Sequence, residues 1–327
     1  MEFELISRLL AATACQREDV VLGAGDDGAV LSVASGQQLV ASVDTLVEGV
    51  HFLPGTAARD IGWKALAANL SDLAAMGASP AWALLGLTMP KADSGFVDGL
   101  AAGFNALAGR YKLCLVGGDT TSGPLTVGIT VLGLVPTGKA LTRRGAQPGD
   151  VIFVTGTLGA GAAGLHCLQP EHDDADRLLS APGDAREQLI ERYMRPLPRI
   201  DVGRNLRDVA SACIDLSDGL LADLGHLCSA SGVGAEIEAA RLPRAAALMD
   251  LFGEAASIEY ALGGGDDYEL CFTVPARKAD ALAADLVRAG HAVSRIGRIV
   301  DGTSVCVLGE NGRPITPRWR GWEHFGS

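Results

Sequence analysis

Several features that would identify a class of protein are missing from this sequence. No window of about 18 uninterrupted apolar residues occurs, which argues against a membrane span. The first residues lack the basic segment of a signal peptide. Lys and Arg form no cluster and the net charge is −12, whereas a nucleic-acid binder usually has a basic face. We therefore expect neither a nucleic-acid nor a membrane partner.

The usual metal-binding and nucleotide-binding patterns are also missing. Seven cysteines are scattered without a C-x-x-C pair, and the six histidines show no paired spacing, so zinc is disfavoured. An odd, dispersed set of cysteines is typical of reduced core thiols, and we expect a cytoplasmic protein without a disulfide framework. A Walker A sequence and the H-R-D and D-F-G motifs of protein kinases are absent, so nucleotide use would need a different scaffold.

The length of 327 residues is more than one hydrophobic core usually supports, so two domains are expected. A polar stretch punctuated by Gly and Pro at residues 136–150 marks the junction, which gives domains at 1–137 and 138–327. Both parts mix strands with two or three helices. The sequence therefore predicts two α/β or α+β units.

Hydrophobic periodicity predicts the individual elements. Helices are expected at residues 3–15, 59–77, 93–110, 219–229 and 276–289, and the glycine-rich segment 156–164 opens a further one. An acidic loop is expected at 170–184 and a rigid, Pro-containing connector at 195–199. Strands are expected within 20–33 and at 38–52, 82–89, 113–116, 125–135, 151–155, 213–216, 236–238, 293–300 and 304–308, with a further strand before Thr273.

The glycine turn at residues 23–28, Gly-Ala-Gly-Asp-Asp-Gly, fits the G-x-G-x-x-G dinucleotide fingerprint. Asp44 even lies near the distance expected of a ribose-binding acid. However, two adjacent carboxylates would face the pyrophosphate, and residues 30–33 have the composition of a strand where the fingerprint needs a helix. A dinucleotide-dependent oxidoreductase therefore stays an alternative that depends on this motif alone.

Aspartates recur at strand ends, in glycine turns and on the Ala-rich helix expected at 59–77. Each one alone is more often a helix cap or turn former, but so many in similar contexts favour a site for several cations. Asp72 lies on a very apolar helix, where a carboxylate needs a partner, and Asn69 shares its face. The set comprises Asp26, Asp27, Asp44, Asp72, Asp119, Asp215, Asp218, Asp266 and Asp267.

Magnesium suits such a cluster, because this cation takes oxygen ligands and commonly bridges carboxylates to substrate phosphates. Two glycine-rich segments, 117–120 and 156–161, have backbone N–H groups that could meet phosphate oxygens. The residues themselves thus favour a magnesium-dependent enzyme that acts on phosphates. A non-enzymatic module that binds cations or nucleotides remains open at this point.

Taken together, these motifs resemble those of the thiamine-monophosphate kinase family, within the superfamily of aminoimidazole-ribonucleotide synthetase-like ATP-binding proteins. The resemblance runs nearly end to end and its motifs are long. They occupy residues 25–29, 42–52, 64–78, 117–121, 141–143, 214–220, 264–270 and 321–325.

The resemblance implies a two-domain α/β (α+β) fold, in which an N-terminal mixed sheet with helices pairs across a homodimer. A C-terminal α/β sandwich would complete the active-site cleft. The implied reaction is direct in-line transfer of the ATP γ-phosphoryl group to thiamine monophosphate, which gives thiamine diphosphate and ADP. Several Mg²⁺ ions would be needed, and a monovalent cation is left open.

The resemblance also implies a role for individual residues. Asp44, Asp72, Asp119 and Arg143 would be catalytic. His51, Asp266 and Trp322 would contact the thiamine end, although the family usually has Glu where this chain has Asp266. The nucleotide would contact Gly118, Asp119, Arg143, Ser217 and Tyr111. The metal ligands would be Asp27, Ser42, Val43 (through its backbone), Asp44, Asp72, Asp119, Asp215 and Asp218, with Asp26 as a support for its turn.

Other members of the same superfamily give the nearest alternatives. A selenophosphate synthetase would need a reactive Cys or selenocysteine near a glycine-rich N-terminal segment, and Cys15 lacks that setting. A hydrogenase-maturation factor is the second such alternative. An assay for thiamine diphosphate formation separates both from the kinase.

Overall fold

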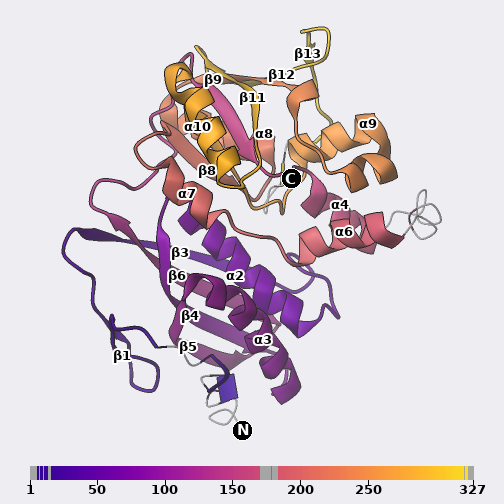
Figure 1. The fold of residues 1–327 in the computed structure, drawn as a ribbon. Helices are drawn as coiled ribbons and strands as arrows, with labels where there is room; N and C mark the ends of the chain where they lie inside the picture. Colours follow the sequence, from indigo (N-terminus) through magenta and orange to yellow (C-terminus); the bar gives the residue numbers. More distant parts are fainter. Residues whose placement is uncertain are drawn as a thin grey trace. The chain divides into compact units, whose positions relative to one another are not determined.

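The computed structural model describes residues 6, 8–9, 11–13, 16–169, 178, 183–319 and 321–322 (Figure 1). Most of the helix expected at 3–15, most of the loop expected at 170–184 and the tail after Trp322 lie outside the described residues. The chain forms two compact units. The first comprises Met1–Leu73 and Ala78–Ala140, and the second comprises Leu141–Ser327 together with Ala74–Gly77.

A four-stranded sheet with the order β3-β6-β4-β5 forms the centre of the first unit. β4 and β5 are parallel, because α3 carries the chain back between them, whereas the other two pairs are antiparallel. The sheet is therefore mixed, as expected. Its strands are β3 (Gln37–Val47), β4 (Ser79–Met89), β5 (Cys114–Ser122) and β6 (Thr126–Pro136).

Two long helices, α2 (Ala58–Ala75) and α3 (Ser94–Tyr111), lie against one face of this sheet (Figure 1). Glycine allows their backbones to approach closely: a Cβ at Gly103 would lie 1.8 Å from the carbonyl oxygen of Arg59. Residues 61–71 of α2 are all buried. A polar side chain on this helix must therefore find a partner inside the unit.

The short strands β1 (Val20–Leu22) and β2 (Val30–Leu31) pair antiparallel around the aspartate turn. Val20 and Leu31 pack with Trp82 and Val116 of the sheet, and Trp82 Nε1 donates to Asp19 at 3.2 Å. Cys114 in the same cluster is disulfide-bonded, which differs from the expectation of reduced thiols throughout. The free cysteines among the described residues are Cys167, Cys213, Cys228, Cys271 and Cys306.

The second unit is built on a seven-stranded sheet with the order β13-β12-β9-β11-β7-β10-β8. Only the β9–β12 pair is parallel. The strands are β7 (Val151–Thr155), β8 (Ala212–Leu216), β9 (Gly234–Glu238), β10 (Glu269–Val274), β11 (Val293–Val300), β12 (Val305–Leu308) and β13 (Pro314–Ile315).

Helices and a sheet together form the cores of this unit. In the larger core, Leu220, Leu224 and Leu227 of α8 pack on Ile214 and Ile237 of the sheet. A second core joins α4, α6 and α9 through Ala163, Leu189 and Leu248. The helices are α4 (Ala160–Leu168), α6 (Gly183–Met194), α7 (Ile200–Leu206), α8 (Leu220–Ser231), α9 (Ala246–Gly263) and α10 (Ala276–Arg288), with a 3-10 turn, η1, at Ala239–Arg241.

Some elements differ from the sequence-based expectation. β3 ends at Val47, not at Phe52, because Gly49 takes a positive φ of 80° and the chain turns. β5 continues through the glycines to Ser122, where a turn was expected. α6, α7 and α9 were not predicted, and α9 is interrupted at Gly253, whose φ of 76° is not helical. No helix among the described residues has the length and apolar character needed to cross a membrane.

Candidate active site

The aspartate turn between β1 and β2 has the form that its glycines predict. Asp26 and Asp27 are exposed, and the backbone N–H of Asp27 donates to Asp26 Oδ1 at 2.8 Å. Asp26 therefore supports the turn, as predicted. The segment after Gly28 leads into a strand, β2, so the helix of a dinucleotide site is missing and that interpretation of G-x-G-x-x-G is wrong. Asp27 as a metal ligand stays a prediction.

Three predicted residues come together where β3 passes α2. The Ser42 hydroxyl donates to Asp72 Oδ2 at 2.6 Å. One turn earlier on α2, Asn69 Oδ1 accepts the backbone N–H of Asp44 at 2.9 Å, while its Nδ2 donates to the carbonyl of Ala65. Asn69 is fully buried, whereas Ser42, Asp44 and Asp72 are half-buried. Oxygen donors from two elements are thus fixed in one place.

Gly118 and Asp119 are neighbours on β5, but they belong to opposite faces of the sheet. The cross-strand row of Asp44 runs through Ile129 and Leu85 to Gly118. The next row runs from Thr45 through Gly128 and Gly86 to Asp119. Successive rows of a sheet face opposite sides, so Asp119 belongs to the face opposite the helices and is exposed. Val43 has the same parity and is 62% exposed.

His51 lies in the loop that follows β3 and is half-buried. Its Nδ1 accepts the backbone N–H of Val47 at 3.0 Å, so the ring proton of the neutral form is on Nε2. Its carbonyl accepts a 3.0 Å bond from Nζ of Lys64, a lysine of α2 that is only 2% exposed. The residue is therefore held at its ring by the end of β3 and at its backbone carbonyl by α2. Tyr111, the other predicted contact, is the last residue of α3 and half-buried.

In the second unit, Asp215, Ser217 and Asp218 lie at the end of β8 and in the turn before α8. The N-cap of α8 is Gly219, and no side chain at that position caps the helix. The carboxylate of Asp223, one turn into α8, accepts the backbone N–H groups of Ser217, Asp218 and Gly219. Burial, and then the charge of Asp218, raise the pKa of Asp223 to about 7.

This same turn is bonded to the residues predicted to contact the thiamine end. The N–H of Asp266 donates to the Ser217 carbonyl at 2.8 Å, and the N–H of Trp322 donates to the Asp218 carbonyl at 3.0 Å. Asp266 has a φ of 65°, a conformation that Asp tolerates better than most residues, and its carboxylate accepts from the Tyr268 hydroxyl at 3.0 Å. The Trp322 side chain is 57% exposed. Predicted metal-binding and substrate-binding groups are therefore neighbours.

The adjacent aspartate, Asp267, bonds through its carboxylate to the start of α4. It is buried and accepts the N–H groups of Gly159 and Gly161 at the start of α4, at 2.7 and 3.1 Å. The N–H groups of Gly156 and Leu158 donate to the carbonyls of Ala292 and Pro243. These donors are already used inside the unit, so the structure does not support residues 156–161 as a phosphate cradle. Burial raises the pKa of Asp267 to about 7.

Glu269, in the same motif, carries a buried ion-pair cluster. Its side chain has no exposure, and it pairs with Arg192 at 2.8 Å and with both Nε and an NH2 group of Arg199. The Thr155 hydroxyl donates a further 2.6 Å bond. Burial alone would raise the pKa of Glu269, but these arginines hold it below its usual value. The sequence did not predict a role for this residue or for Asp223.

Arg143, the remaining predicted residue, lies in the exposed loop after Leu141. Its carbonyl accepts from the Ser231 hydroxyl at 2.9 Å, and the carbonyl of the preceding Thr142 accepts the N–H of Cys213 on β8. This loop is thus attached beside β8, the strand that leads to Asp215. Its role toward the nucleotide stays a prediction.

Among the described residues, no three His, Cys, Asp or Glu side chains are grouped as a ready metal site. The predicted ligands instead form separate groups: the turn at Asp27, the Ser42–Asp72 contact, Asp119 on its own face, and the Asp215–Asp218 turn. All their donors are carboxylate, hydroxyl or carbonyl oxygens. Such donors fit Mg²⁺, which usually keeps part of its coordination for water and substrate phosphates.

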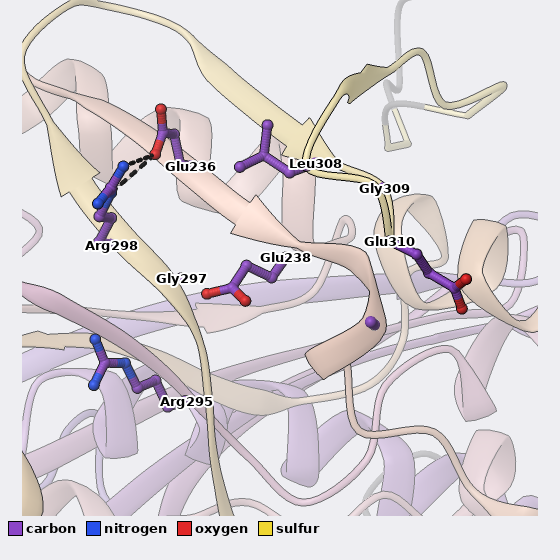
Figure 2. Close-up of a pocket in the computed structure, with 10 residues that line it drawn as sticks. Glu236, Glu238, Arg295, Gly297, Arg298, Leu308, Gly309 and Glu310 are labelled. Carbon is purple, nitrogen blue, oxygen red and sulfur yellow. Dashed lines mark hydrogen bonds and ion pairs between the residues drawn. The ribbon is translucent and has the colours of Figure 1, made fainter.

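A separate pocket of about 360 Å³ lies on the sheet of the second unit, where β9, β11 and the end of β12 meet (Figure 2). Glu236 and Arg298, which are cross-strand neighbours on β9 and β11, both line it and are ion-paired at 2.7 Å. Glu238 also lines the pocket and pairs with Arg241 at 2.7 Å. None of the predicted site residues lines this pocket, so it is not part of the site described above.

Two families of domains match the chain. The AIR synthase related protein, N-terminal domain, matches residues 25–135, and the AIR synthase related protein, C-terminal domain, matches residues 147–308. The thiamine-monophosphate kinase of Escherichia coli strain K12 is 46% identical over 325 residues, which cover 99% of this chain and 98% of that protein. This similarity extends over both units.

Solved structures agree with this similarity. The crystal structure of thiamine-monophosphate kinase from Stenotrophomonas maltophilia K279a is 46% identical, with a TM-score of 0.86 over 96% of this chain and 98% of that one. AaThiL complexed with AMPPCP and TMP is 33% identical, with a TM-score of 0.76 over 99% and 97%. The hydrogenase maturation protein HypE of E. coli, at 23% identity and a TM-score of 0.76 over 96% of each chain, shares the fold alone.

Proposed function

This chain belongs to the AIR synthase related family and, within it, to the thiamine-monophosphate kinases, and from that membership we propose how its residues perform the reaction. The enzyme transfers the γ-phosphoryl group of ATP to thiamine monophosphate. A phosphate oxygen of the acceptor forms the new P–O bond, the bond from the γ-phosphorus to the β,γ-bridging oxygen breaks, and ADP leaves. The kinases of this family in E. coli and S. maltophilia resemble this chain over nearly its whole length.

We propose that Ser42, Asp44, Asp72 and Asp119 of the first unit bind Mg²⁺, together with Asp27 and the Val43 carbonyl. The support is chemical: every donor is a hard oxygen, and the Ser42–Asp72 hydrogen bond and the Asn69–Asp44 bond fix three of them. When bound, the ions neutralise charge on the two phosphate groups that must meet. Gly118 and Tyr111 belong to the nucleotide contacts of this proposal, and a monovalent cation stays open.

In the second unit we propose Asp215 and Asp218 as further Mg²⁺ ligands, and Ser217 and Arg143 as contacts of the nucleotide. Asp266 and Trp322 of the second unit, together with His51 of the first, would bind the thiamine end. The observation that carries this assignment is the pair of backbone bonds from Asp266 to Ser217 and from Trp322 to Asp218. These bonds make the position of one group depend on the position of the other.

The chain's own residues have to solve a problem of position and charge. The acceptor is a phosphate oxygen that is already anionic, so the step needs no strong general base and no covalent intermediate. Holding both phosphates in line supplies much of the acceleration in such reactions. Arg143 would donate charged hydrogen bonds to the transferring group. Trp322 would lie over the cationic thiazolium ring.

We propose a homodimer that forms through the sheet face opposite α2 and α3. Leu39, Val43 and Leu84 are 48%, 62% and 37% exposed there, and large apolar side chains exposed on one face are typical of an interface. We also propose a cytoplasmic location, which the free cysteines among the described residues support.

The direct test is to incubate the purified protein with ATP, Mg²⁺ and thiamine monophosphate and to measure thiamine diphosphate and ADP by chromatography. We expect the two products in equal amounts. No thiamine diphosphate from a folded protein would overturn the proposal. Selenide in place of thiamine monophosphate, and NADH binding followed by fluorescence, test the alternatives, and neither is expected to give a signal.

A further inference from the structure

The turn of Ser217, Asp218 and Gly219 is held by a side chain that the proposed reaction does not use. Oδ2 of Asp223 accepts the three consecutive backbone N–H groups of this turn, at 3.1, 3.1 and 3.2 Å. Asp223 is only 3% exposed, and it lies in the first turn of α8. One carboxylate oxygen therefore accepts three hydrogen bonds from the backbone of the turn that contains Ser217 and Asp218.

The carbonyl side of the same turn is fixed by backbone donors. Leu216, Ser217 and Asp218 accept the N–H groups of Tyr268, Asp266 and Trp322, at 2.8, 2.8 and 3.0 Å. Gly219 has a φ of 114°, and a Cβ there would lie 2.9 Å from the Gly263 backbone. The turn is thus fixed on both sides: its N–H groups bond to the Asp223 side chain, and its carbonyl groups bond to backbone N–H groups.

The bonds to Asp223 differ from ordinary capping of a helix. The first N–H groups of a helix usually bond to the side chain of a Ser, Thr, Asp or Asn at the N-cap. Here the N-cap is Gly219, and no side chain at the N-cap closes the turn. Asp223 instead accepts the N–H groups of Ser217, Asp218 and Gly219, which precede the first helical residue, Leu220, so it orders the turn that leads into α8 and does not cap the helix.

We propose that Asp223 is a positioning residue for phosphoryl transfer: it holds the 217–219 turn so that Ser217 and Asp218 present their oxygens to the nucleotide and to Mg²⁺. Asp223 itself touches neither substrate nor metal in this role. The inference rests on the function proposed above for Ser217 and Asp218. It adds a residue whose chemistry the resemblance did not assign.

Two variants test this role. Asp223→Asn keeps the size of the side chain but replaces one acceptor oxygen by a donor, and Asp223→Ala removes all three bonds. Asp285→Ala is the matched control, because Asp285 is an exposed helical aspartate of α10 that pairs with the nearby Arg288. Thermal unfolding checks that each variant folds, and Asp223→Asn serves if the Ala variant does not.

The first measurement needs no activity. Hydrogen exchange of the Ser217, Asp218 and Gly219 amides, followed in the ligand-free protein, should be slow in the wild type and at least about tenfold faster in Asp223→Asn. In the second, the Mg²⁺ concentration for half-maximal rate should rise about 10- to 100-fold, as for other residues that orient metal ligands. The control should match the wild type in both.

Each outcome has one meaning. Faster exchange together with a higher Mg²⁺ concentration for half-maximal rate supports the proposal. Exchange and Mg²⁺ dependence at wild-type values in a folded variant would overturn it while the kinase function stands. Faster exchange with unchanged Mg²⁺ dependence would also overturn it, because Asp223 would then be structural only. A wild-type protein that makes no thiamine diphosphate would overturn both, which separates that failure from the others.

Discussion

The Ser42 hydroxyl on β3 donates a 2.6 Å hydrogen bond to Asp72 on α2. This contact joins two motifs that lie 30 residues apart in the sequence. It explains how a helix with a fully buried middle section carries a carboxylate: Asp72 lies at the half-buried edge, where a strand hydroxyl meets it. A cation that replaced the hydroxyl proton as the partner of Asp72 would find oxygen donors already in position.

Asp44 is the residue in this group with the clearest expected effect on activity. Asp44→Asn keeps the size of the side chain and the backbone bond to Asn69, but it removes the charge proposed to face Mg²⁺. We expect the turnover number to fall by about 100-fold or more, the order seen when one electrostatic stabiliser of a transition state is removed. The melting temperature should change little. Steady-state kinetics and thermal unfolding of the same preparation check both.

Asp98→Asn is the control for this variant, since Asp98 is exposed in the same unit and pairs with the half-exposed Arg8, at 3.2 Å. It should keep wild-type turnover. Equal turnover in Asp44→Asn and Asp98→Asn would show that the Asp44 carboxylate is not part of the reacting cluster.

The elements with the clearest periodicity were predictable. β6 alternates strictly between buried and half-buried residues over its whole length, and the expected strand at 125–135 differs by one residue at each end. α2 was expected at 59–77 and ends at Ala75, with Gly77 at φ 64° after it. α9 was missed because Gly253 interrupts it, so no single helical period covers its sequence.

The site residues show where sequence patterns stop being informative. The β-bulge between Ala83 and Leu84 shifts the register of β5, and this shift decides which face Asp119 belongs to. No pattern in the sequence marks that bulge. Likewise, the Asp266–Asp267 pair is symmetric in the sequence, and only the packing of α4 assigns capping to Asp267. Local turn chemistry, as at Asp26, was predictable because it needs only neighbouring residues.

Trp322 gives a prediction about substrate binding. Trp322→Ala removes the exposed indole but keeps the backbone bond to Asp218. A lost cation–π contact of about 0.5–2 kcal/mol corresponds to a KM for thiamine monophosphate that is about 2- to 30-fold higher. The KM for ATP should stay the same, and Trp322→Phe should recover part of the loss. An unchanged KM for thiamine monophosphate in the Ala variant would remove Trp322 from the substrate contacts.

The exposed apolar face of the first unit gives a prediction about assembly. Leu84→Asp introduces a charge beside Gly117, where the strand surface is open, and it should convert a dimer into monomers in sedimentation velocity. Val287→Asp is the matched control, because Val287 is 60% exposed on α10 of the second unit and should not alter the sedimentation coefficient. A Leu84→Asp protein that sediments as the wild-type dimer would exclude this face as the interface.

The cluster around Glu269 gives a prediction about stability. Glu269→Gln leaves Arg192 and Arg199 without the buried carboxylate that they share. Removing one partner of a buried pair is strongly destabilising, and we expect a loss of about 3 kcal/mol in the free energy of unfolding at pH 7, measured with urea. Glu238→Gln is the control: Glu238 forms a half-exposed pair with Arg241, so it should cost less than about 1 kcal/mol.

The same variant has a predictable pH dependence. Because the arginines lower the pKa of Glu269 below its ordinary value of 4.5, the folded protein holds this proton less tightly than the unfolded chain. The stability from the cluster is therefore fully present above pH 4.5 and is lost as the pH falls through the lowered pKa. The difference in unfolding free energy between wild type and Glu269→Gln should be largest at neutral pH and should shrink in acid. A difference that stays constant from pH 7 into the acid range would mean that the Glu269 charge does not stabilise the second unit, and that its arginines are held by hydrogen bonds alone.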